Sequence, residues 1–468
     1  MCIFHIWGHT KAMDTPQNSK AAVIGNETQL DAGSSSLNST DDIVEVSYSD
    51  NQTHLSITAV LSYCKRKILS PYLLFLSLMG LRPLALERYE TSIFCDILSY
   101  VYMFVITTFM VFGYILQYMA CFRRDRGFCY SFNSQSDISA NIIYSEWGID
   151  KQERFNRICH GSLVFTFIVP NCLHLFGYLY AVYVIRSSDD DQLPCLMERV
   201  FVSCSYISNG FLNQKRLVKI LWFSIFLGLI WIILSLISII LLLLQDGISF
   251  RWLENSSSIT VVLLKILLVT CTFFHDMVQA TVISCYCLQA QLLTSYLQFL
   301  KAKLLESPVQ AIEWMREIYE FKKLLRYLNE DLAPPMCFFT FINLAWTTTG
   351  ILWSLGYDHI DVITVPVLGI NILIITLWAA LSLAPFFQAA RLTNACKLIK
   401  GVGHEVRIRP FVHQDTPAHD LNSLLLFASS LDIEAKIFRV PIHGRYLAAI
   451  ITTAAILILI LGEIHYLS

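Results

Sequence analysis

Long apolar runs, each bounded by polar segments, dominate the chain. An α-helix needs about 20 apolar residues to cross the hydrocarbon core of a bilayer, and seven runs reach or approach that length. They cover about residues 93–118, 161–185, 217–244, 259–306, 336–355, 362–390 and 441–468. The pattern predicts an all-α, polytopic membrane protein with seven transmembrane helices.

Residues 1–90 contain no uninterrupted apolar run long enough to span a bilayer. Residues 1–60 are rich in Ser, Thr, Asn and Asp, which is typical of a disordered tail. Residues 61–90 contain an apolar stretch that Pro71, Gly80 and Pro83 interrupt. Because these residues disfavour a continuous helix, the stretch predicts an interfacial or re-entrant helix ahead of the first span.

Helical sequence also continues beyond the bilayer. The fourth run extends to about residue 306, and residues 308–331 have apolar positions on one face and cations elsewhere. We therefore expect helical extensions outside the membrane. The remaining divisions are a six-helix membrane domain at 91–390, a cytoplasmic anchor segment at 391–440 and the last helix at 441–468.

Composition supports the membrane class and excludes several functions. The chain has 468 residues, of which 55% are hydrophobic and 15% charged, whereas soluble proteins carry about 25% charged residues. Mean hydropathy is +0.54. No basic tract indicates nucleic acid, and no P-loop, GxSxG, HExxH or metal-like His/Cys spacing indicates an enzyme, a cofactor or a metal site.

The distribution of Lys and Arg predicts the orientation. With a cytoplasmic amino terminus, most cationic segments lie inside, as the positive-inside rule requires; the exception is the cluster at 123–126. The glycosylation sequon at Asn255 fits this orientation, whereas those at Asn26, Asn38 and Asn51 fit the opposite one. We follow the charge distribution. Whether Cys121, Cys129 and Cys159, which share one loop, form a disulfide stays open.

The last run has the pattern of a helix that lines a cation pathway. Thr452, Ala455, Leu459 and Glu463 lie on one stripe at helical spacing. Several copies around an axis would place Glu463 at the mouth, Leu459 as a hydrophobic constriction and Thr452 deeper in the pore. Ile460 replaces Leu459 if the helix is rotated. The alternative is an ordinary final helix with Glu463 in interfacial water and the Thr452 hydroxyl bonded to the carbonyl four residues earlier.

Three segments resemble the insect-type chemoreceptor superfamily of gustatory and odorant receptors, above all the gustatory branch. SPYLLFLSLMGLRP at 70–83 resembles the Gly-Leu-x-Pro segment ahead of that family's first helix, and LLRYLN at 324–329 resembles the entry into its fifth. The basic 391–440 segment running into a final aliphatic helix resembles its most characteristic region. The gustatory branch ends with Thr-Tyr, five hydrophobic residues and Gln-Phe. Here the five aliphatic residues are present, at 457–461, but the four flanking residues differ, which is typical of a divergent member.

This resemblance implies a ligand-gated, non-selective cation channel in the plasma membrane. Four identical or related subunits would surround a pore lined by the last helix, with Na⁺, K⁺ and Ca²⁺ as permeant ions. The 391–440 segment, with the cytoplasmic ends of the fourth to sixth helices, would form the anchor where subunits meet. A small organic tastant or other chemical ligand would bind in a pocket that opens from the outside among the second to sixth helices.

Depth along the helices, together with aromatic or polar character, suggests candidates for that pocket. They are Phe165, Asn171, His174, Trp346, Trp353, Tyr357, Asn371 and Trp378. In the fourth run, His275, Asp276 and Gln279 form the most conspicuous polar group, and ionisable residues in a membrane face a cavity or a partner. Asp276 lies roughly 25 Å in at 1.5 Å per residue, which favours an interhelical or anchor role over an outside pocket.

Two other functions fit a polytopic chain. A G-protein-coupled receptor with an extracellular amino terminus agrees with the three tail sequons, but the sequence has no Asp-Arg-Tyr after a third helix and no Asn-Pro-x-x-Tyr in a seventh. A transporter predicts internal repeats and broken helices with paired charges, and neither is evident. We therefore expect a gustatory-receptor-like channel.

Overall fold

The computed structural model describes residues 57–83, 93–120, 122, 164–187, 192–205, 210–246, 250, 257–306, 310–355, 365–408 and 416–467. All of them belong to one compact unit, residues 54–468. Almost all of the expected tail at 1–60 lies outside the described residues, as do Asn26, Asn38, Asn51, Asn255, Cys121, Cys129 and Cys159.

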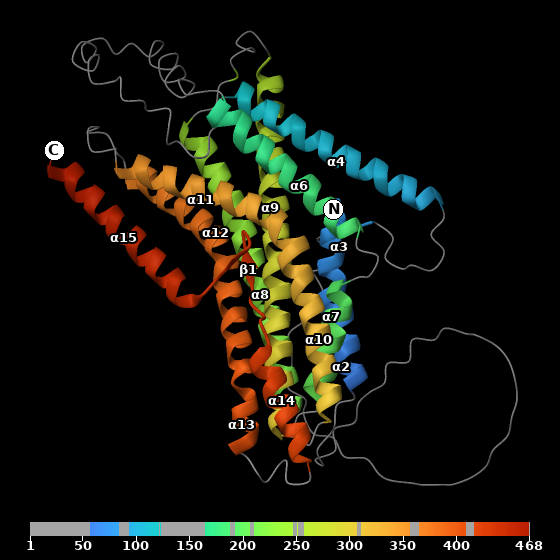
Figure 1. The fold of residues 1–468 in the computed structure, drawn as a ribbon. Helices are drawn as coiled ribbons and strands as arrows, with labels where there is room; N and C mark the ends of the chain where they lie inside the picture. The colour runs from blue at the N-terminus through green and yellow to red at the C-terminus, as the bar shows by residue number, and fades with distance from the viewer. Residues whose placement is uncertain are drawn as a thin grey trace, which may run out of the picture. The chain divides into compact units, whose positions relative to one another are not determined.

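Each of the seven expected spans is helical (Figure 1). They are α4 (Ile93–Met119), η3 with α6 (Val164–Ile168 and Val169–Ser187), α8 (Gly210–Asp246), α9 (Ser258–Glu306), α11 (Ala333–Leu355), α12 (Val365–Lys400) and α15 (Gly444–Leu467). The other helices are α2 (Ile57–Cys64), η1 (Lys65–Leu69), α3 (Ser70–Leu78), α7 (Gln192–Ser205), α10 (Ala311–Tyr327), η4 (Leu328–Leu332), α13 (Val402–Ile408) and α14 (Ala418–Ser430), where η denotes a π-helical segment.

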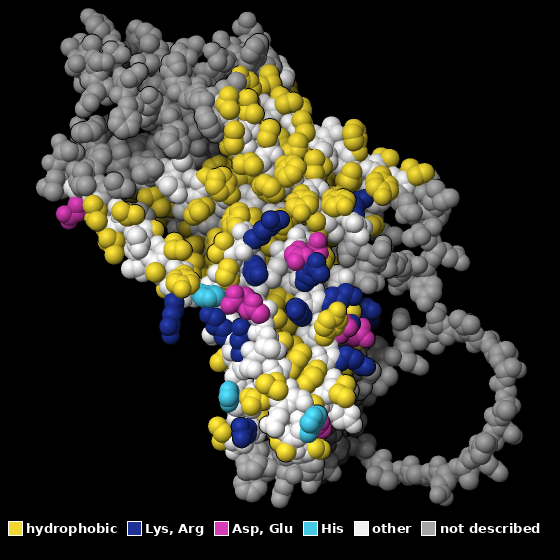
Figure 2. All heavy atoms as spheres, in the orientation of Figure 1, with side chains coloured by type: hydrophobic (Ala, Val, Ile, Leu, Met, Phe, Trp, Pro, Cys, Tyr) yellow, Lys and Arg dark blue, Asp and Glu magenta, His cyan; other side chains and the backbone are white. Residues whose placement is uncertain are grey.

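Four described helices are long and apolar enough to cross a membrane, judged by length and composition. These stretches are Ile97–Met119, Asn213–Leu244, Ser258–Glu306 and Leu368–Lys400. Large apolar side chains are exposed along them: Phe104 is 69% exposed, Phe223 65% and Ile259 73%. Figure 2 shows hydrophobic side chains over the upper part of the face in view and a band of Lys and Arg beneath them. The protein is an all-α membrane protein, as predicted.

The helix α9 is the element around which its neighbours pack. Its 49 residues span about 74 Å at 1.5 Å per residue, more than twice the hydrocarbon thickness of a bilayer. It contacts α4, α6, α7, α8, α10, α11, α12 and α13. Its first turns are largely exposed, whereas most of its second half is buried. One helix therefore carries both the membrane bundle and the extension expected below it.

The helix α10 covers the extension, with the amphipathic orientation that the sequence predicted. Trp314, Ile318 and Phe321 are fully buried, and the indole Nε1 of Trp314 donates to the Leu300 carbonyl at 3.2 Å. Beneath them Lys303 pairs with Glu317 at 2.9 Å and with Glu313 at 3.4 Å. Burial lowers the pKa of the Lys303 ammonium, but the hydrogen bond and charge of Glu317, followed by those of Glu313, outweigh it and raise the pKa overall.

A two-stranded hairpin connects this extension to the last helix. Strands β1 (Lys436–Ile437) and β2 (Val440–Pro441) pair antiparallel, around a turn in which Phe438 and Arg439 have positive φ. The Asn329 side chain donates to the Glu434 carbonyl at 3.0 Å and accepts from the Lys436 amide at 3.0 Å. The expected border at residue 391 lies inside α12, which continues to Lys400, and α15 begins at Gly444, directly after this hairpin.

The Gly-Leu-x-Pro segment follows α3. Here the chain contacts α4 and α6, the first two expected spans. Gly80 has a φ of +73°, and a Cβ at this position would lie 2.8 Å from the Tyr178 hydroxyl. That hydroxyl donates to the Met79 carbonyl at 3.2 Å, while Arg186 donates to the Gly80 carbonyl at 3.0 Å. Tyr102 adds a bond of 2.7 Å to the Leu78 carbonyl. A side chain at position 80 would therefore disturb both the backbone and its packing.

We expect Gly80→Ala to destabilise the protein by about 2 kcal/mol, because an L-residue with positive φ costs about 1–2 kcal/mol and the Tyr178 hydroxyl must also shift. Thermal unfolding of the detergent-solubilised protein measures the effect. Gly228→Ala in α8 is the matched control, since nothing lies within 4 Å of its added Cβ, and it should leave stability equal or slightly higher. Equal melting temperatures for the two variants would contradict this account.

Candidate functional site

A cluster of polar side chains lies inside the bundle, centred on the predicted group of α9. His275 is 6% exposed, Asp276 1% and Gln279 0%. Polar groups in an apolar interior are stable when their hydrogen bonds are satisfied. The neighbouring helices α4, α6, α8 and α11 supply partners, so this cluster joins five helices.

The first half of the cluster contains two histidines and a tyrosine. The Tyr114 hydroxyl of α4 lies 2.7 Å from Nδ1 of His174 on α6, and the Tyr114 ring stacks on that of His275 with centroids 4.4 Å apart. Close approach of α4 and α9 depends on Gly113, where a Cβ would lie 2.8 Å from both Cys271 Cβ and His275 Cε1.

The partners of the two imidazoles determine their tautomers. Nε2 of His275 lies 3.0 Å from the Met110 carbonyl, and Nε2 of His174 lies 3.3 Å from the His275 carbonyl. A carbonyl oxygen only accepts, so both rings carry hydrogen on Nε2. In the neutral form of each ring Nδ1 accepts, from the Tyr114 hydroxyl in His174 and from the Gln117 amide, 3.3 Å away, in His275.

The second half of the cluster surrounds the carboxylate of Asp276. Ser235 of α8 donates to Asp276 Oδ2, and the Gln279 amide donates to Oδ1 at 3.2 Å. The Gln279 oxygen accepts from Asn343 of α11 at 3.2 Å. Asn343 Oδ1 is buried and has no hydrogen-bond partner among the described residues. These bonds connect α8, α9 and α11 in series.

An aromatic group lies where α8, α11 and α12 meet. The rings of Trp346 and Trp378 are 5.1 Å apart, and Trp378 is 2% exposed. On α8, Trp231 donates its Nε1 hydrogen to the Leu377 carbonyl at 3.0 Å. Two of the predicted pocket residues, from the consecutive helices α11 and α12, are thus in contact.

The other predicted pocket residues have separate positions. His174 belongs to the histidine pair and also contacts the Phe339 ring of α11 at 5.1 Å. Asn171 is half-buried one turn earlier on α6, and Asn371 is 5% exposed on α12. Tyr357 and the side chains of Phe165 and Trp353 lie outside what the structure describes. Helix α11 is shared by the histidine and tryptophan groups, so a site among these helices would include it.

Sequence reasoning identified the members of the cluster on α9 but missed their partners. Tyr114, Gln117, Ser235 and Asn343 are single polar residues inside apolar runs, and Tyr114 and Gln117 share a helix face at a spacing of three. This spacing is the signal that the sequence contained. Among the described residues, no group of three or more His, Cys, Asp or Glu side chains is placed to hold a metal ion.

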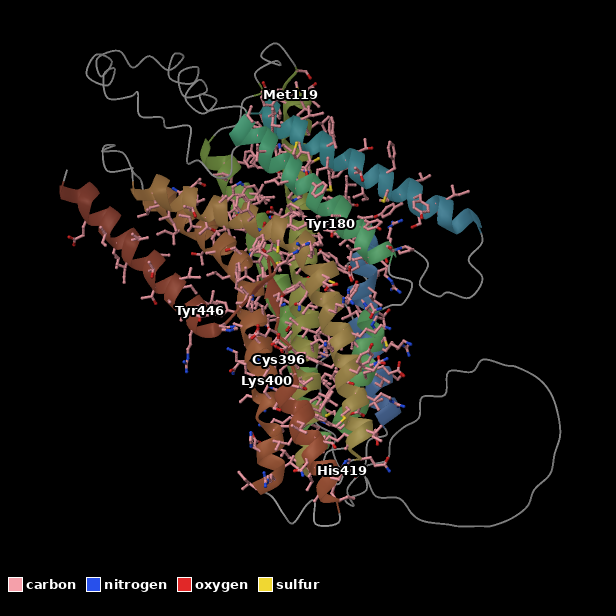
Figure 3. All side chains as sticks on the ribbon, in the orientation of Figure 1. Met119, Tyr180, Cys396, Lys400, His419 and Tyr446 are labelled. Atoms are coloured by element: carbon pink, nitrogen blue, oxygen red, sulfur yellow. The ribbon has the colours of Figure 1, made fainter. Side chains whose placement is uncertain are left out.

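The predicted pore residues lie on exposed surface of α15. Leu459 is 69% exposed and Ile460 48%, and Thr452, Ala455 and Glu463 are also exposed. The Thr452 hydroxyl donates to the Ala448 carbonyl at 2.8 Å, which is the local bond considered as the alternative. Helix α15 contacts α11 and α12, and Figure 3 shows side chains projecting along it beyond Tyr446.

The fold is similar to that of solved insect olfactory receptor structures. The structure of the insect olfactory receptor OR5 from Machilis hrabei in complex with eugenol aligns with a TM-score of 0.56 and 12% sequence identity, over 85% of this chain and 98% of that one. A second structure of this receptor aligns with a TM-score of 0.58 and 13% identity, over 85% and 97% of the two chains. No protein-family model and no curated protein sequence matches.

We expect Tyr114→Phe to lower stability by about 1 kcal/mol, because it leaves Nδ1 of the buried His174 without this donor. Thermal unfolding in detergent measures the change. Tyr118→Phe, one turn along α4, is the matched control: Tyr118 is 45% exposed, and phenylalanine keeps its ring contact with Phe167. If both variants unfold at the wild-type temperature, the Tyr114 hydroxyl does not stabilise the cluster.

Proposed function

We propose that this protein is a chemosensory, ligand-gated, non-selective cation channel of the insect-type receptor superfamily, related to its gustatory branch. Four copies, identical or together with a related subunit, surround a pore lined by α15. The channel lies in the plasma membrane with its amino terminus in the cytosol. The fold likeness to insect olfactory receptors supports the family, and the resemblance in the sequence supports the gustatory branch.

The observation that carries this proposal is the exposure of α15 around most of its circumference. Tyr446, Ile450 and Leu457 share one face at spacings of four and seven, Leu459 lies on the opposite face, and each is more than half exposed. An apolar helix that its own chain leaves uncovered needs lipid or other copies around it. The helix also carries Thr452 and Glu463, which lipid would not solvate. Copies around an aqueous axis satisfy both requirements.

In such an assembly Thr452, Leu459 and Glu463 of α15 form successive levels of the pore with different chemistry. Leu459 from four copies forms an apolar ring that excludes water when the helices are close, which closes the pore. One turn beyond it, Glu463 from four copies forms a carboxylate ring that concentrates Na⁺, K⁺ and Ca²⁺. Thr452 lies two turns before Leu459, with its hydroxyl hydrogen committed to Ala448 and its oxygen available to a permeating ion.

Ligand binding would act on the pore through α11 and α12, because both helices contact α15. The Trp346–Trp378 pair joins them, and aromatic surfaces with a few polar groups suit a small organic molecule. Eugenol, the ligand in the related structure, is of this chemical kind. A ligand that favours one packing of α11 against α12 would shift the population of open pores in proportion to its difference in affinity for the two states.

We expect Glu463→Gln to change cation preference while ligand-evoked opening remains, because it removes the carboxylate ring but keeps the side-chain shape. Reversal potentials of ligand-evoked currents in Na⁺ and Ca²⁺ solutions measure the cation preference. We expect the permeability to Ca²⁺ to decrease relative to that to Na⁺. Glu198→Gln, at an exposed glutamate of α7, should leave both unchanged. Wild-type permeability ratios in Glu463→Gln would place this carboxylate away from the mouth.

We expect Leu459→Ala to raise the current in the absence of ligand, since the smaller ring no longer excludes water from the closed pore. Ile460→Ala, the adjacent substitution, should leave the unstimulated current near the wild-type level. Whole-cell recording with matched surface expression compares them. The opposite result would mean that the helix is rotated and that Ile460 forms the constriction; no effect from either would remove α15 from the gate.

A further inference from the structure

Exposed cations from distant parts of the sequence lie at one level of the bundle. Contacts between side chains give the register of the helices beside α9: Ser235 of α8 meets Asp276, and Tyr72 of α3 meets Ser284. Both helices run antiparallel to α9 (Figure 1). Lys219 precedes Ser235 by 16 residues and is therefore level with about residue 292 of α9. Lys67 precedes Tyr72 by five and is level with about residue 289.

The exposed surface changes character at the same level on two helices. On α8, exposed Trp222 and Phe223 follow directly after the exposed Lys219. On α12, Phe387 is 51% exposed, and one turn later Arg391 is exposed and bonded to Gln291 of α9 at 3.0 Å. Apolar and aromatic surface that gives way to cations marks the boundary between acyl chains and headgroups.

The length of α9 agrees with this boundary. From Ser258 to about residue 289 the helix rises about 46 Å at 1.5 Å per residue. A bilayer with its headgroup regions is about 40–45 Å thick, and a tilt of about 20° is usual. The level of Lys67 and Lys219 is therefore one headgroup layer, and the other layer lies near the first turn of α9.

Five of these cations form what we call the cationic rim: Lys65, Arg66, Lys67, Arg216 and Lys219. All five side chains are exposed, and none makes an ion pair with any other residue that the structure describes. Nearby cations differ, since Arg199 pairs with Glu320 at 3.0 Å and Lys301 with Glu405 at 2.7 Å. The rim cations are therefore not neutralised by any acid among the residues that the structure describes.

The segment η1 holds three rim cations in a fixed, outward-facing arrangement. Cys64 before them is fully buried, and Ile68 and Leu69 after them are each 3% exposed. Because these neighbours are anchored in the core, Lys65, Arg66 and Lys67 are held on the outer side. Helix α7 lies between this segment and α8: it contacts α2, which continues into η1, and it contacts α8. Its Glu198 is an exposed acid in this region.

We propose that the cationic rim binds the phosphorylated headgroups of anionic lipids in the leaflet that it borders. Clustered Lys and Arg beside a transmembrane helix attract such lipids, and the rim has the charge, the depth and the exposed apolar surface of α8 directly above it. A lipid with its phosphates at Arg216 and Lys219 can place its acyl chains against Trp222 and Phe223 of the same helix. The assignment of this leaflet to the cytosolic side rests on the orientation in the proposed function. Lipid binding by the purified protein does not depend on that orientation.

The test compares two triple substitutions that remove the same charge. Lys65→Gln/Arg66→Gln/Lys67→Gln removes the η1 part of the rim. Arg316→Gln/Lys397→Gln/Arg407→Gln removes three exposed cations below it. Binding of fluorescent short-chain phosphatidylinositol bisphosphate to the purified full-length protein in detergent is measured by fluorescence anisotropy at two salt concentrations. Each cation at an anionic surface contributes roughly fivefold to affinity, so the η1 variant should bind roughly 100-fold more weakly and the lower variant within about threefold of wild type.

Two further arms make every outcome decisive. Lys65→Arg/Lys67→Arg keeps the charge and should retain the wild-type affinity, which excludes a folding defect as the cause of a loss. Inositol hexakisphosphate, a soluble polyphosphate without acyl chains, should displace the lipid only at much higher concentration. Equal weakening by both triple substitutions, or none by the η1 variant, would overturn the site. Tighter binding of the soluble polyphosphate than of the lipid would overturn the lipid as its ligand. Ion conduction is not measured, so failure here leaves the proposed function untouched.

Discussion

The structure depends on pairing the polar side chains that α9 carries into an apolar interior. An unsatisfied polar group at this depth costs more than most packing contacts contribute. His275 therefore requires α4 and α6 at a defined rotation, while Asp276 and Gln279 require α8 and α11. Because a helix exposes a given residue on one face only, these bonds orient four neighbours around one axis. Leucines and isoleucines alone would allow several rotations of similar energy.

Helix α9 also organises the part of the protein beyond the membrane. Its lower half forms the core on which α7, α10 and α13 pack, so the bundle and the extension share one rigid element. The route from this core to α15 is short: Asn329 holds the segment before β1, and the β1–β2 turn redirects the chain into Gly444. The direction in which the last helix leaves is therefore set by the extension. Beyond this base, α15 contacts α11 and α12.

The two chemical surfaces of the molecule follow from the same division. Above the level of Lys219 the exposed side chains are apolar and aromatic, because lipid surrounds them. Below it the surface carries cations, of which Arg199 pairs with Glu320 and Lys301 with Glu405. The five rim cations form no ion pair with any other residue that the structure describes. An unpaired Lys or Arg in a water-facing surface is ordinary, but five at one level beside α8 have the arrangement that an anionic headgroup layer complements.

The sequence by itself determined the membrane class, the seven helices and the buried face of α10, because run length and helical periodicity are local properties of the chain. It also identified His275 and Asp276, since ionisable residues in apolar runs stand out. It did not reveal that Tyr114, Gln117, Ser235 and Asn343 would be their partners, or that Trp346 would meet Trp378. Nor did it reveal the β1–β2 hairpin, whose two-residue strands are too short for a periodic signal. These contacts join residues up to 161 positions apart, as Tyr114 and His275 are, and such pairs form only when the helices have been packed in one register and rotation.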